Sequence, residues 1–342
     1  MSDERDLAAR LEAFVASEEG RRPGQVRVEG LRRLAGGASR ELWALDLELG
    51  GDAPRKLELV LRRDPPGRLG ESDRSLEFRL LAAAAEAGVP VPAVHWCCAD
   101  PEVLGSAFFL MGRVAGETLP RRILRDERYA AARRDLARQL GGVLAGIHRI
   151  DPDRPDLSDL ASAAGGAESA RAEVARIGEG LRAMAAQPHP ALDLAERWLL
   201  ERAPEPSRRT VVHGDFRLGN LVVGEDGLRA VLDWELSHVG DPLEDLGWLC
   251  LRAWRFGSDD LAVGGVGTRE ALLEAYEEAG GGRVDREALR FWEACGNLKL
   301  ALVFATQARL FLDGLPSVEL ASLGRRIAEA EDELLRFMDG RA

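Results

Sequence analysis

The residues best suited to chemistry lie close together in "VVHGDFRLGNLVVGEDGLRAVLDWE", residues 211–235. His213, Asp215 and Asn220 follow the pattern H-x-D-x-x-x-x-N, and Asp233 comes thirteen residues after the asparagine. In such a pattern the aspartate accepts a hydroxyl proton and the asparagine holds a metal. Phosphoryl transfer needs hard oxygen ligands for Mg²⁺, together with one carboxylate that stays free of metal. The stretch therefore predicts a phosphoryl-transfer site.

The sequence around these residues predicts how they are brought together. Two short apolar runs, "NLVV" and "RAVLDW", enclose "GEDG", which has the composition of a turn. A hairpin of that size would fold Asp233 back beside Asn220. Gly214 allows a tight backbone conformation next to Asp215. The polar groups are therefore predicted to converge on one nucleotide–metal site.

The elements that must position this site fall into two parts of different composition. Over roughly the first 115 residues the order is strand, strand, strand, helix, strand, strand. Segments with apolar residues at helical spacing then dominate, interrupted by the short strands around the loop. We predict an α+β protein: residues 1–115 form a five-stranded antiparallel sheet plus a helix, and residues 116–342 form a mainly helical part.

Two helix predictions bear directly on the site. The segment "SDRSLEFRLLAAAAEAG" is expected to begin after Ser72 or Asp73 as N-cap and to stop at Gly88. The segment "DPLEDLGWLCLRAW", residues 241–254, is expected to be helical and follows the chemistry-bearing stretch directly.

Composition disfavours several classes of function. The 342 residues carry a net charge of −12, which disfavours binding to nucleic acid. No run approaches eighteen apolar residues and the N-terminus is charged, so neither a membrane span nor a signal peptide is expected. The four cysteines lack metal-binding spacing and are interpreted as reduced thiols of a cytoplasmic protein. The oligomeric state stays open.

The segment "HGDFRLGN", followed by "LDWELSHVGDPLEDLGWL", resembles the aminoglycoside phosphotransferase family of choline kinase-like small-molecule kinases. Within it, the chain is most similar to the branch related to the phosphotransferase modules of acyl-CoA dehydrogenase fusions. The resemblance implies a protein kinase-like fold of two lobes. It also implies a Mg²⁺-dependent enzyme that transfers the γ-phosphoryl group of ATP, or of GTP, to an alcohol group of a small molecule.

The same resemblance implies a role for each residue of the motif. Asp215 would be the catalytic base or hydroxyl-orienting residue. Asn220 would be a magnesium ligand, and Asp233 the principal magnesium ligand. His213 would hold the catalytic loop by hydrogen bonds. Asp241 would support that loop from the start of the next helix.

The nucleotide would be bound by the first 115 residues. The turn that contains Gly36, Gly37 and Ser39 joins the first two strands, and its N–H groups and hydroxyl are expected near the phosphates. The segment "FFLMGRVAGETL" resembles the hinge between lobes, where the backbone from Met111 to Arg113 would meet the edge of adenine.

The third strand carries a departure from the family pattern. In "KLELVLRR" a period of two places Val60 and Arg62 on one face, where the first would pack on adenine and the second would reach the phosphates. A lysine is usual at the second position. Arginine still neutralises phosphates and pairs with a carboxylate, for which Glu77 of the following helix is the expected partner. The replacement puts catalytic efficiency in doubt.

The acceptor pocket is expected between Asp215 and the helices at residues 248–312. An aminoglycoside would need carboxylates for its ammonium groups, whereas an acyl thioester would need an apolar tunnel and basic residues. Both kinds are present: Asp259, Asp260, Glu274, Glu277, Glu278, Arg252, Arg255, Arg290 and Arg309. The resemblance favours a hydroxylated metabolite or an acyl thioester over an aminoglycoside.

Two other functions stay open. A pseudokinase that binds nucleotide but transfers phosphate poorly is supported by the missing lysine. A metal-dependent hydrolase could use His213, Asp215 and His238, and it predicts a tightly bound transition metal without affinity for nucleotide.

Overall fold

The computed structural model describes residues 2–34, 41–51, 54–64, 73–162, 169–206, 208–315 and 317–341. The chain divides into two compact units. The first comprises Met1–Gly116 and Arg229–Glu235, and the second comprises Glu117–Leu228 and Leu236–Ala342. The short segment that carries Asp233 therefore belongs to the first unit, although it lies far from that unit in sequence.

The first unit is built on a five-stranded antiparallel sheet with the strand order β1-β2-β3-β5-β4. Its elements are α1 Ser2–Glu18, β1 Val26–Arg33, β2 Glu41–Leu49, β3 Arg55–Arg63, α2 Arg74–Glu86, β4 Val94–Cys98, α3 Pro101–Leu104 and β5 Phe108–Gly112.

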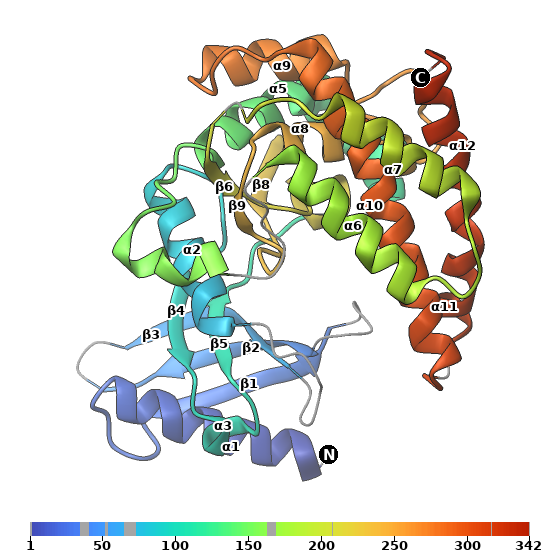
Figure 1. Ribbon diagram of the computed structural model, residues 1–342. Helices are drawn as coiled ribbons and strands as arrows, with labels where there is room; N and C mark the ends of the chain where they lie inside the picture. The colour runs from blue at the N-terminus through green and yellow to red at the C-terminus, as the bar shows by residue number, and fades with distance from the viewer. Residues whose placement is uncertain are drawn as a thin grey trace. The chain divides into compact units, whose positions relative to one another are not determined.

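Helix α1 lies along one face of this sheet (Figure 1). Leu11 and Val15 of α1 pack in one apolar core with Leu61 of β3, and all three are at most 1% exposed. Burying a side chain of this size contributes about 1.5–3 kcal/mol. Because side chains alternate along a strand, this core fixes Val60 and Arg62 on the opposite face of β3.

Helix α2 begins at its predicted cap. The Asp73 side chain accepts a hydrogen bond from the Leu76 N–H at 3.0 Å, as an N-cap residue does. The helix ends at Glu86, and Gly88 has the φ of 78° that favours glycine after a helix. Ser72, the other candidate cap, lies outside the described residues.

The second unit is mainly helical. Its helices are α4 Pro120–Arg125, α5 Ala130–Ile147, α6 Ala170–Met184, α7 Pro190–Arg202, α8 Leu243–Leu249, α9 Arg269–Glu278, α10 Arg286–Leu312, α11 Val318–Leu323 and α12 Ile327–Met338. Short 3-10 segments are η1 Glu127–Tyr129, η2 Pro155–Ser162, η3 Leu218–Asn220, η4 Arg252–Trp254 and η5 Gly324–Arg326.

Helix α10 is the central helix of this unit. It begins at the cap residue Asp285, which accepts hydrogen bonds from two N–H groups of the first turn. It packs against α6, α7, α8, α11 and α12 (Figure 1). Its contact with α8 is close because Gly247 has no side chain: a Cβ there would lie 2.8 Å from the Trp292 carbonyl carbon.

Four short strands frame the chemistry-bearing stretch: β6 Thr210–Val212, β7 Leu221–Gly224, β8 Gly227–Val231 and β9 His238–Gly240. Strand β6 pairs with β9, and β7 and β8 form the hairpin that the sequence predicts. Val212, which ends β6, is fully buried and anchors the loop that starts at His213.

The predicted helix at residues 241–254 is wrong beyond Leu249. Helix α8 ends there, Leu251 is extended with φ −57° and ψ 139°, and a 3-10 turn follows. The Cys250 carbonyl accepts a hydrogen bond from the Arg255 side chain at 2.8 Å. A guanidinium therefore occupies an acceptor that a continuing helix would use for a backbone N–H.

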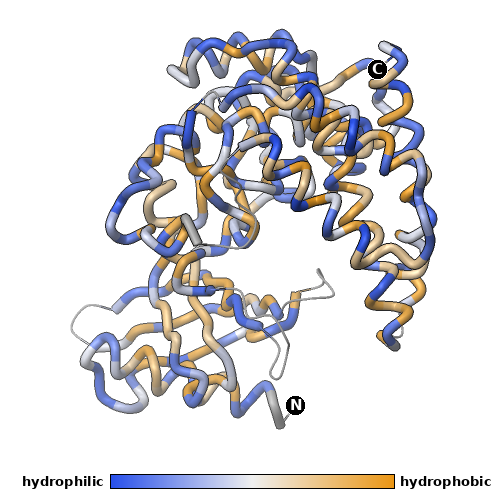
Figure 2. The backbone as a smooth tube through the Cα atoms, viewed as in Figure 1, coloured by the Kyte–Doolittle hydropathy of each residue, from blue (hydrophilic) through white to orange (hydrophobic). Residues whose placement is uncertain are grey.

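The two units together confirm the predicted fold class, a five-stranded antiparallel sheet with a helix followed by a mainly helical part. Hydrophilic and hydrophobic residues alternate along the helices and strands (Figure 2). Within the described part of the chain, none of the helices is both long enough and apolar enough to cross a membrane.

Candidate active site

The Asp215 carboxylate is held by three donors. Its Oδ1 accepts hydrogen bonds from Arg217 Nε and from Trp248 Nε1, both at 2.9 Å. Its Oδ2 accepts one from Asn220 Nδ2 at 2.7 Å. Since an ionised carboxylate offers about four acceptor positions, one remains on Oδ2 for a further donor such as an alcohol hydroxyl.

Asn220 is oriented by the same contacts. Its Nδ2 also donates to the Asp215 backbone carbonyl at 2.9 Å. Both bonds use the amide nitrogen, so the amide oxygen is the group left to accept a donor or to ligate a metal. The side chain is 6% exposed.

The backbone of this loop depends on Gly214. Its φ is 81°, and a Cβ there would lie 2.3 Å from the Leu236 carbonyl oxygen, so only glycine fits. His213 is fully buried, and its Nδ1 accepts a hydrogen bond from the Asp215 N–H at 3.2 Å. This bond lies within the loop and holds its turn.

A buried carboxylate on α8 holds the loop from outside. Asp245 Oδ2 accepts from the His213 N–H at 2.7 Å, and Oδ1 accepts from the Gly214 N–H at 2.9 Å. Burial is the largest influence on its pKa and acts to raise it. Hydrogen bonds from His148 and from the His213 N–H, with the electrostatic influence of both residues, outweigh burial and lower the pKa of Asp245 below 3.8. Asp245 is therefore ionised and anchors two consecutive N–H groups.

This finding corrects the role predicted for Asp241. Asp241 Oδ1 accepts from the Leu243 N–H at 2.9 Å, and its own N–H donates to Glu244 Oε1 at 3.2 Å, so it caps the start of α8. The acid that supports the loop is Asp245, one turn further on. Both lie in "GDPLED", and the sequence does not show which one the helix turns toward the loop.

Asp245 is itself held by a chain of hydrogen-bonded groups that the sequence did not reveal: buried His148 and Tyr276, and half-buried Arg208. Arg208 donates to the Tyr276 hydroxyl at 3.0 Å, which lies 2.9 Å from His148 Nδ1. His148 Nε2 lies 3.2 Å from Asp245 Oδ2. Because arginine only donates, the tyrosine proton points to Nδ1 and places the histidine proton on Nε2, facing the carboxylate. Burial raises the pKa of Tyr276 to about 12.

Lys299 of α10 is another residue that the sequence analysis missed. Its Nζ donates to the Gly214 carbonyl at 3.1 Å and lies 5.2 Å from the centre of the Trp248 ring. The ammonium group thus contacts both the loop and the tryptophan that donates to Asp215. No local motif marks this lysine, because it lies some eighty residues away in sequence.

In the first unit, Arg62 and Glu77 form the predicted ion pair. Arg62 Nε donates to Glu77 Oε2 at 2.9 Å, and Arg62 Nη2 lies 2.8 Å from Oε1. Arg62 Nη2 also donates to Asp233 Oδ1 at 3.0 Å. A lysine could not present a planar fork to both carboxylates in this way. Arg62 therefore joins the third strand, α2 and the segment that carries Asp233.

Glu77 is shared with a second buried arginine, Arg74, which the sequence analysis missed. Arg74 Nη1 donates to Glu77 Oε2 at 2.5 Å, and its other nitrogens pair with Asp64. Burial lowers the pKa of Arg74, but the carboxylate partners outweigh it and raise the pKa above its ordinary value. This pairing fixes Glu77 independently of Arg62.

Asp233 has an unusual backbone conformation, with φ of 68°. Apart from glycine, aspartate and asparagine are among the residues that tolerate this left-handed region best. Such conformations cost free energy and cluster at functional sites.

The predicted adenine-binding segment is tied into the sheet. Val60 pairs with Met111 in register, and both are less than 10% exposed. The Arg113 N–H donates to the Glu58 carbonyl at 2.8 Å, and its guanidinium lies 3.0 Å from Asp46. The N–H of Arg113 is therefore already engaged. The predicted phosphate-binding residues Gly36, Gly37 and Ser39 lie outside the described residues.

The residues predicted to bind a metal carry hard oxygen donors. Within the described residues, no three His, Cys, Asp or Glu side chains group as a protein-only metal site requires. His238, named for the hydrolase alternative, is buried and bonded to Glu244 Oε2 at 3.0 Å and to the Leu236 carbonyl at 2.9 Å. The Asp233 carboxylate and the Asn220 amide oxygen, taken separately, are hard oxygen donors of the kind that Mg²⁺ prefers.

The chain matches a known protein family and curated relatives. The model of the phosphotransferase enzyme family matches residues 30–292. The chain is 32% identical over 236 residues to acyl-CoA dehydrogenase family member 10 of Mus musculus, which covers 64% of this chain and 21% of that protein. The chain thus spans about a fifth of that relative's length.

Solved structures confirm the kinase-like fold. A candidate aminoglycoside phosphotransferase from Ralstonia eutropha JMP134 is similar with a TM-score of 0.73 and 23% identity, over 97% of this chain and 98% of that one. The aminoglycoside phosphotransferase APH(4)-Ia, in ternary complex with AMP-PNP and hygromycin B, has a TM-score of 0.60 and 18% identity, over 96% and 99%.

Proposed function

The chain belongs to the phosphotransferase enzyme family, and on that basis we propose that it transfers the γ-phosphoryl group of ATP to a hydroxyl group of a small molecule. The observation that carries this proposal is the Asp215 carboxylate, which three donors hold with one acceptor position open. That arrangement suits a group that must orient an incoming hydroxyl.

We assign the steps to residues of the chain as follows. Asp215 Oδ2 accepts the hydrogen bond of the acceptor hydroxyl and takes its proton as the hydroxyl oxygen bonds to the γ-phosphorus. The bond from this phosphorus to the bridging oxygen breaks, and ADP leaves with the electron pair of that bond. Asn220 would hold Mg²⁺ through its amide oxygen and Asp233 through its carboxylate. The metal would supply positive charge against the negative charge that develops during transfer. His213, Asp245 and Lys299 hold the loop and do not touch reacting atoms.

Arg62 would bind the phosphates in place of the usual lysine. Its guanidinium is 6% exposed and held by Glu77, so its position is fixed before nucleotide arrives. Arginine keeps its charge at any physiological pH and bonds phosphate with two parallel N–H groups. The ion pair between Arg62 and Asp233 also supports the alternative function, a pseudokinase. A pseudokinase would keep that pair when nucleotide is present.

For the acceptor we propose a hydroxylated metabolite or an acyl thioester. The support is the name of the relative, a member of an acyl-CoA dehydrogenase family, together with four arginines in the helical unit that the sequence analysis noted. An antibiotic acceptor such as the hygromycin B bound by APH(4)-Ia is the other outcome of an acceptor screen.

A thermal-shift titration with ATP and GTP, each with and without Mg²⁺, tests the nucleotide site first. A ligand that binds only the folded state raises its stability by about 2.7 kcal/mol at a hundredfold excess over Kd. We expect an upshift that requires Mg²⁺. Turnover is then measured with hydroxylated metabolites, acyl thioesters and aminoglycosides in parallel. A shift without turnover would support the pseudokinase, and no shift with either nucleotide would contradict the proposal.

A further inference from the structure

Three consecutive residues after α8 are structurally unusual: two have buried side-chain N–H groups without an acceptor, and one has a left-handed backbone conformation. Trp254 Nε1 and Arg255 Nε are buried, and neither finds a hydrogen-bond acceptor among the described residues. Phe256, the next residue, has φ of 49°. Unpaired buried donors and left-handed non-glycine residues cost free energy, and they cluster where function requires them. The segment 254–256 is therefore a candidate binding site outside the catalytic loop.

Two adjoining cavities border this segment. The first has a volume of about 190 Å³ and the second about 340 Å³. Both are lined by Arg252, Asp259, Asn297 and Glu333, so they share a wall. Small-molecule sites are typically clefts of about 300–1,000 Å³. The pair is large enough to hold a small organic molecule.

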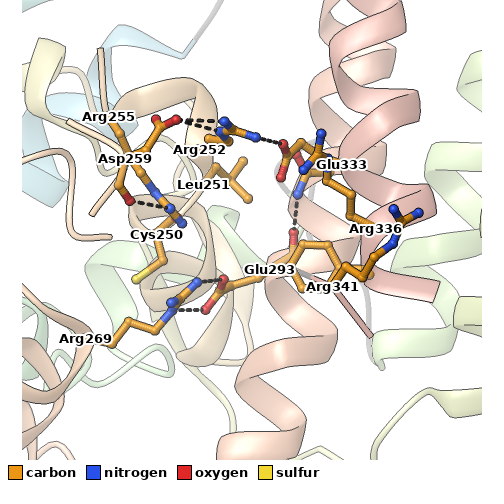
Figure 3. Close-up of a pocket in the computed structure, with 12 residues that line it drawn as sticks. Cys250, Leu251, Arg252, Arg255, Asp259, Arg269, Glu293, Glu333, Arg336 and Arg341 are labelled. Atoms are coloured by element: carbon orange, nitrogen blue, oxygen red, sulfur yellow. Dashed lines mark hydrogen bonds and ion pairs between the residues drawn. The ribbon is translucent and has the colours of Figure 1, made fainter. Parts of the chain in front are cut away.

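The first cavity is rich in cationic side chains (Figure 3). Its lining includes five arginines and three carboxylates: Arg252, Arg255, Arg269, Arg336, Arg341, Asp259, Glu293 and Glu333. This excess of positive charge occurs in a chain whose net charge is −12. Arg336 and Arg341 pair with Asp332 and Asp339, two carboxylates outside this lining. The positive charge left for an anionic ligand in this cavity is therefore that of Arg255.

Arg255 is the arginine of this cavity that lacks a carboxylate. Arg252 pairs with Asp259 at 2.7 Å and with Glu333 at 3.0 Å, and Arg269 binds both oxygens of Glu293. Within the described residues, Arg255 forms no ion pair and donates instead to the Cys250 and Asp259 carbonyls, at 2.8 and 3.1 Å. The carboxylates of Asp259 and Glu293 act on Arg255 electrostatically, but both are hydrogen-bonded to other arginines.

The electrostatics of Arg255 agree with this geometry. Burial, and next the nearby charge of Arg269, lower the pKa of Arg255. A bound anion would stabilise the Arg255 guanidinium, because it supplies a negative charge and a hydrogen-bond acceptor for Nε. The second cavity is lined by four carboxylates and two arginines, and Phe256 and Ala253 supply apolar surface in it. The anionic group is therefore expected at Arg255 in the first cavity, and the carbon chain beside Phe256.

We propose that these two cavities bind a small organic anion, whose carboxylate or phosphate group pairs with Arg255 and whose carbon chain lies beside Phe256. The site would communicate with the catalytic loop through Trp254. That ring lies 5.3 Å from the Trp248 ring, and Arg217 lies 5.0 Å above it. Both Trp248 and Arg217 donate to Asp215. The binding claim does not require that the chain transfer a phosphoryl group.

Calorimetric titration of the intact chain without nucleotide tests the proposal. The probes are hexyl phosphate, hexanoate, hexanol and inorganic phosphate. We expect at least one of the two organic anions to bind. Whether hexyl phosphate or hexanoate binds more tightly shows whether the site prefers a phosphate or a carboxylate. Hexanol should not bind measurably, and inorganic phosphate should bind less tightly than hexyl phosphate. If neither organic anion binds, or if hexanol binds equally well, the proposal is wrong.

Single substitutions test whether the anion binds at Arg255. Arg255→Gln should weaken binding of the preferred anion about tenfold or more, as expected when a charged hydrogen bond is lost. Arg138→Gln removes an equal charge from an exposed pair with Glu278 and should leave the affinity unchanged. Arg336→Gln, at an exposed side chain of the cavity, should weaken binding by a smaller factor and serves if Arg255→Gln does not fold. An affinity equal to that of the unmodified chain in both cavity variants would overturn the proposal. The MgATP thermal shift of Arg255→Gln shows separately whether the nucleotide site is intact.

Discussion

The catalytic loop of the second unit and the Arg62 region of the first unit hold their key carboxylates in different ways. Asp215 receives hydrogen bonds from an indole, an amide and a guanidinium, and the loop beneath it is fixed by Asp245 through backbone N–H groups. Asp233 is held by ion pairing with Arg62, which also binds Glu77.

The difference teaches which part must change during the proposed reaction. The bonds around Asp215 leave a position open for a hydroxyl, so the loop can act without rearranging. At Asp233, Oδ1 already accepts a hydrogen bond from Arg62 Nη2 at 3.0 Å, so in the proposed reaction this guanidinium would turn from Asp233 toward the phosphates. We infer that the loop is preorganised and that the Arg62 pair exchanges partners.

The largest effect expected here comes from Asp233→Asn. Without this carboxylate, the Mg²⁺-dependent part of nucleotide binding should disappear and turnover should fall at least about a hundredfold, because the metal loses a charged ligand. Titration calorimetry with ATP, with and without Mg²⁺, measures the first effect. Glu235→Gln is the matched control: its carboxylate lies 3.9 Å from Arg62, and it should retain Mg²⁺-dependent binding. Equal losses in both variants would contradict the assignment.

The second prediction concerns the catalytic loop, which we infer to be preorganised. Asp245→Asn keeps one carbonyl oxygen but loses the charge that two backbone N–H groups and His148 share. The free energy of unfolding should fall by about 3 kcal/mol, as for loss of hydrogen bonds to a charged group. Asp241→Asn keeps an acceptor for the Leu243 N–H at the start of α8 and should cost about 1 kcal/mol or less. Urea denaturation of both variants compares them, and a similar cost in the two would return the supporting role to Asp241.

A smaller effect is expected from Arg62→Lys, which restores the residue usual in related kinases. The ammonium group cannot bond Glu77 and Asp233 through a planar fork, so the ion pair on Asp233 weakens. We expect the KM for ATP to change by about tenfold or less, with kcat retained. Steady-state kinetics at varied MgATP measure this, and a loss of all turnover would show that the arginine geometry is essential.

The smallest effect concerns His238, which lies near the catalytic loop. Burial, the largest influence on its pKa, lowers it, but the charge and hydrogen bond of Glu244 outweigh burial and raise the pKa above 6.5. The raised pKa stabilises the folded state fully below pH 6.5, and this contribution is lost as pH rises through the folded value. The free energy of unfolding should therefore decline above pH 6.5. In Glu244→Gln this decline in the free energy of unfolding should be smaller. An unchanged decline would show that the pair of His238 and Glu244 does not cause it.

The fold could be predicted from local sequence because its elements obey short-range rules. Alternating apolar residues mark β2 and β3, and Asp73 begins α2 as a capping residue. The end of α8 could not be predicted: the sequence stays compatible with a helix through Trp254, and the Arg255 side chain that takes the Cys250 carbonyl is a tertiary feature.

The candidate site was predictable where its residues lie in one motif and not where partners come from afar. Arg62 and Glu77 pair as their positions on strand and helix suggest. Nothing in the spacing of Trp248 and Tyr276 shows that they contact Asp215 and His148. Arg74 was missed for the same reason.

The measurement that tests the central claim most directly is the kinetics of Asp215→Asn. The asparagine keeps the size of the side chain but cannot take a proton. Turnover of MgATP, with the best acceptor found by screening, should fall by a factor of about 10²–10⁴, which is the usual contribution of a positioned base. The thermal shift with MgATP should stay within error of the unmodified chain. Normal turnover by this variant would show that Asp215 is not the group that activates the hydroxyl.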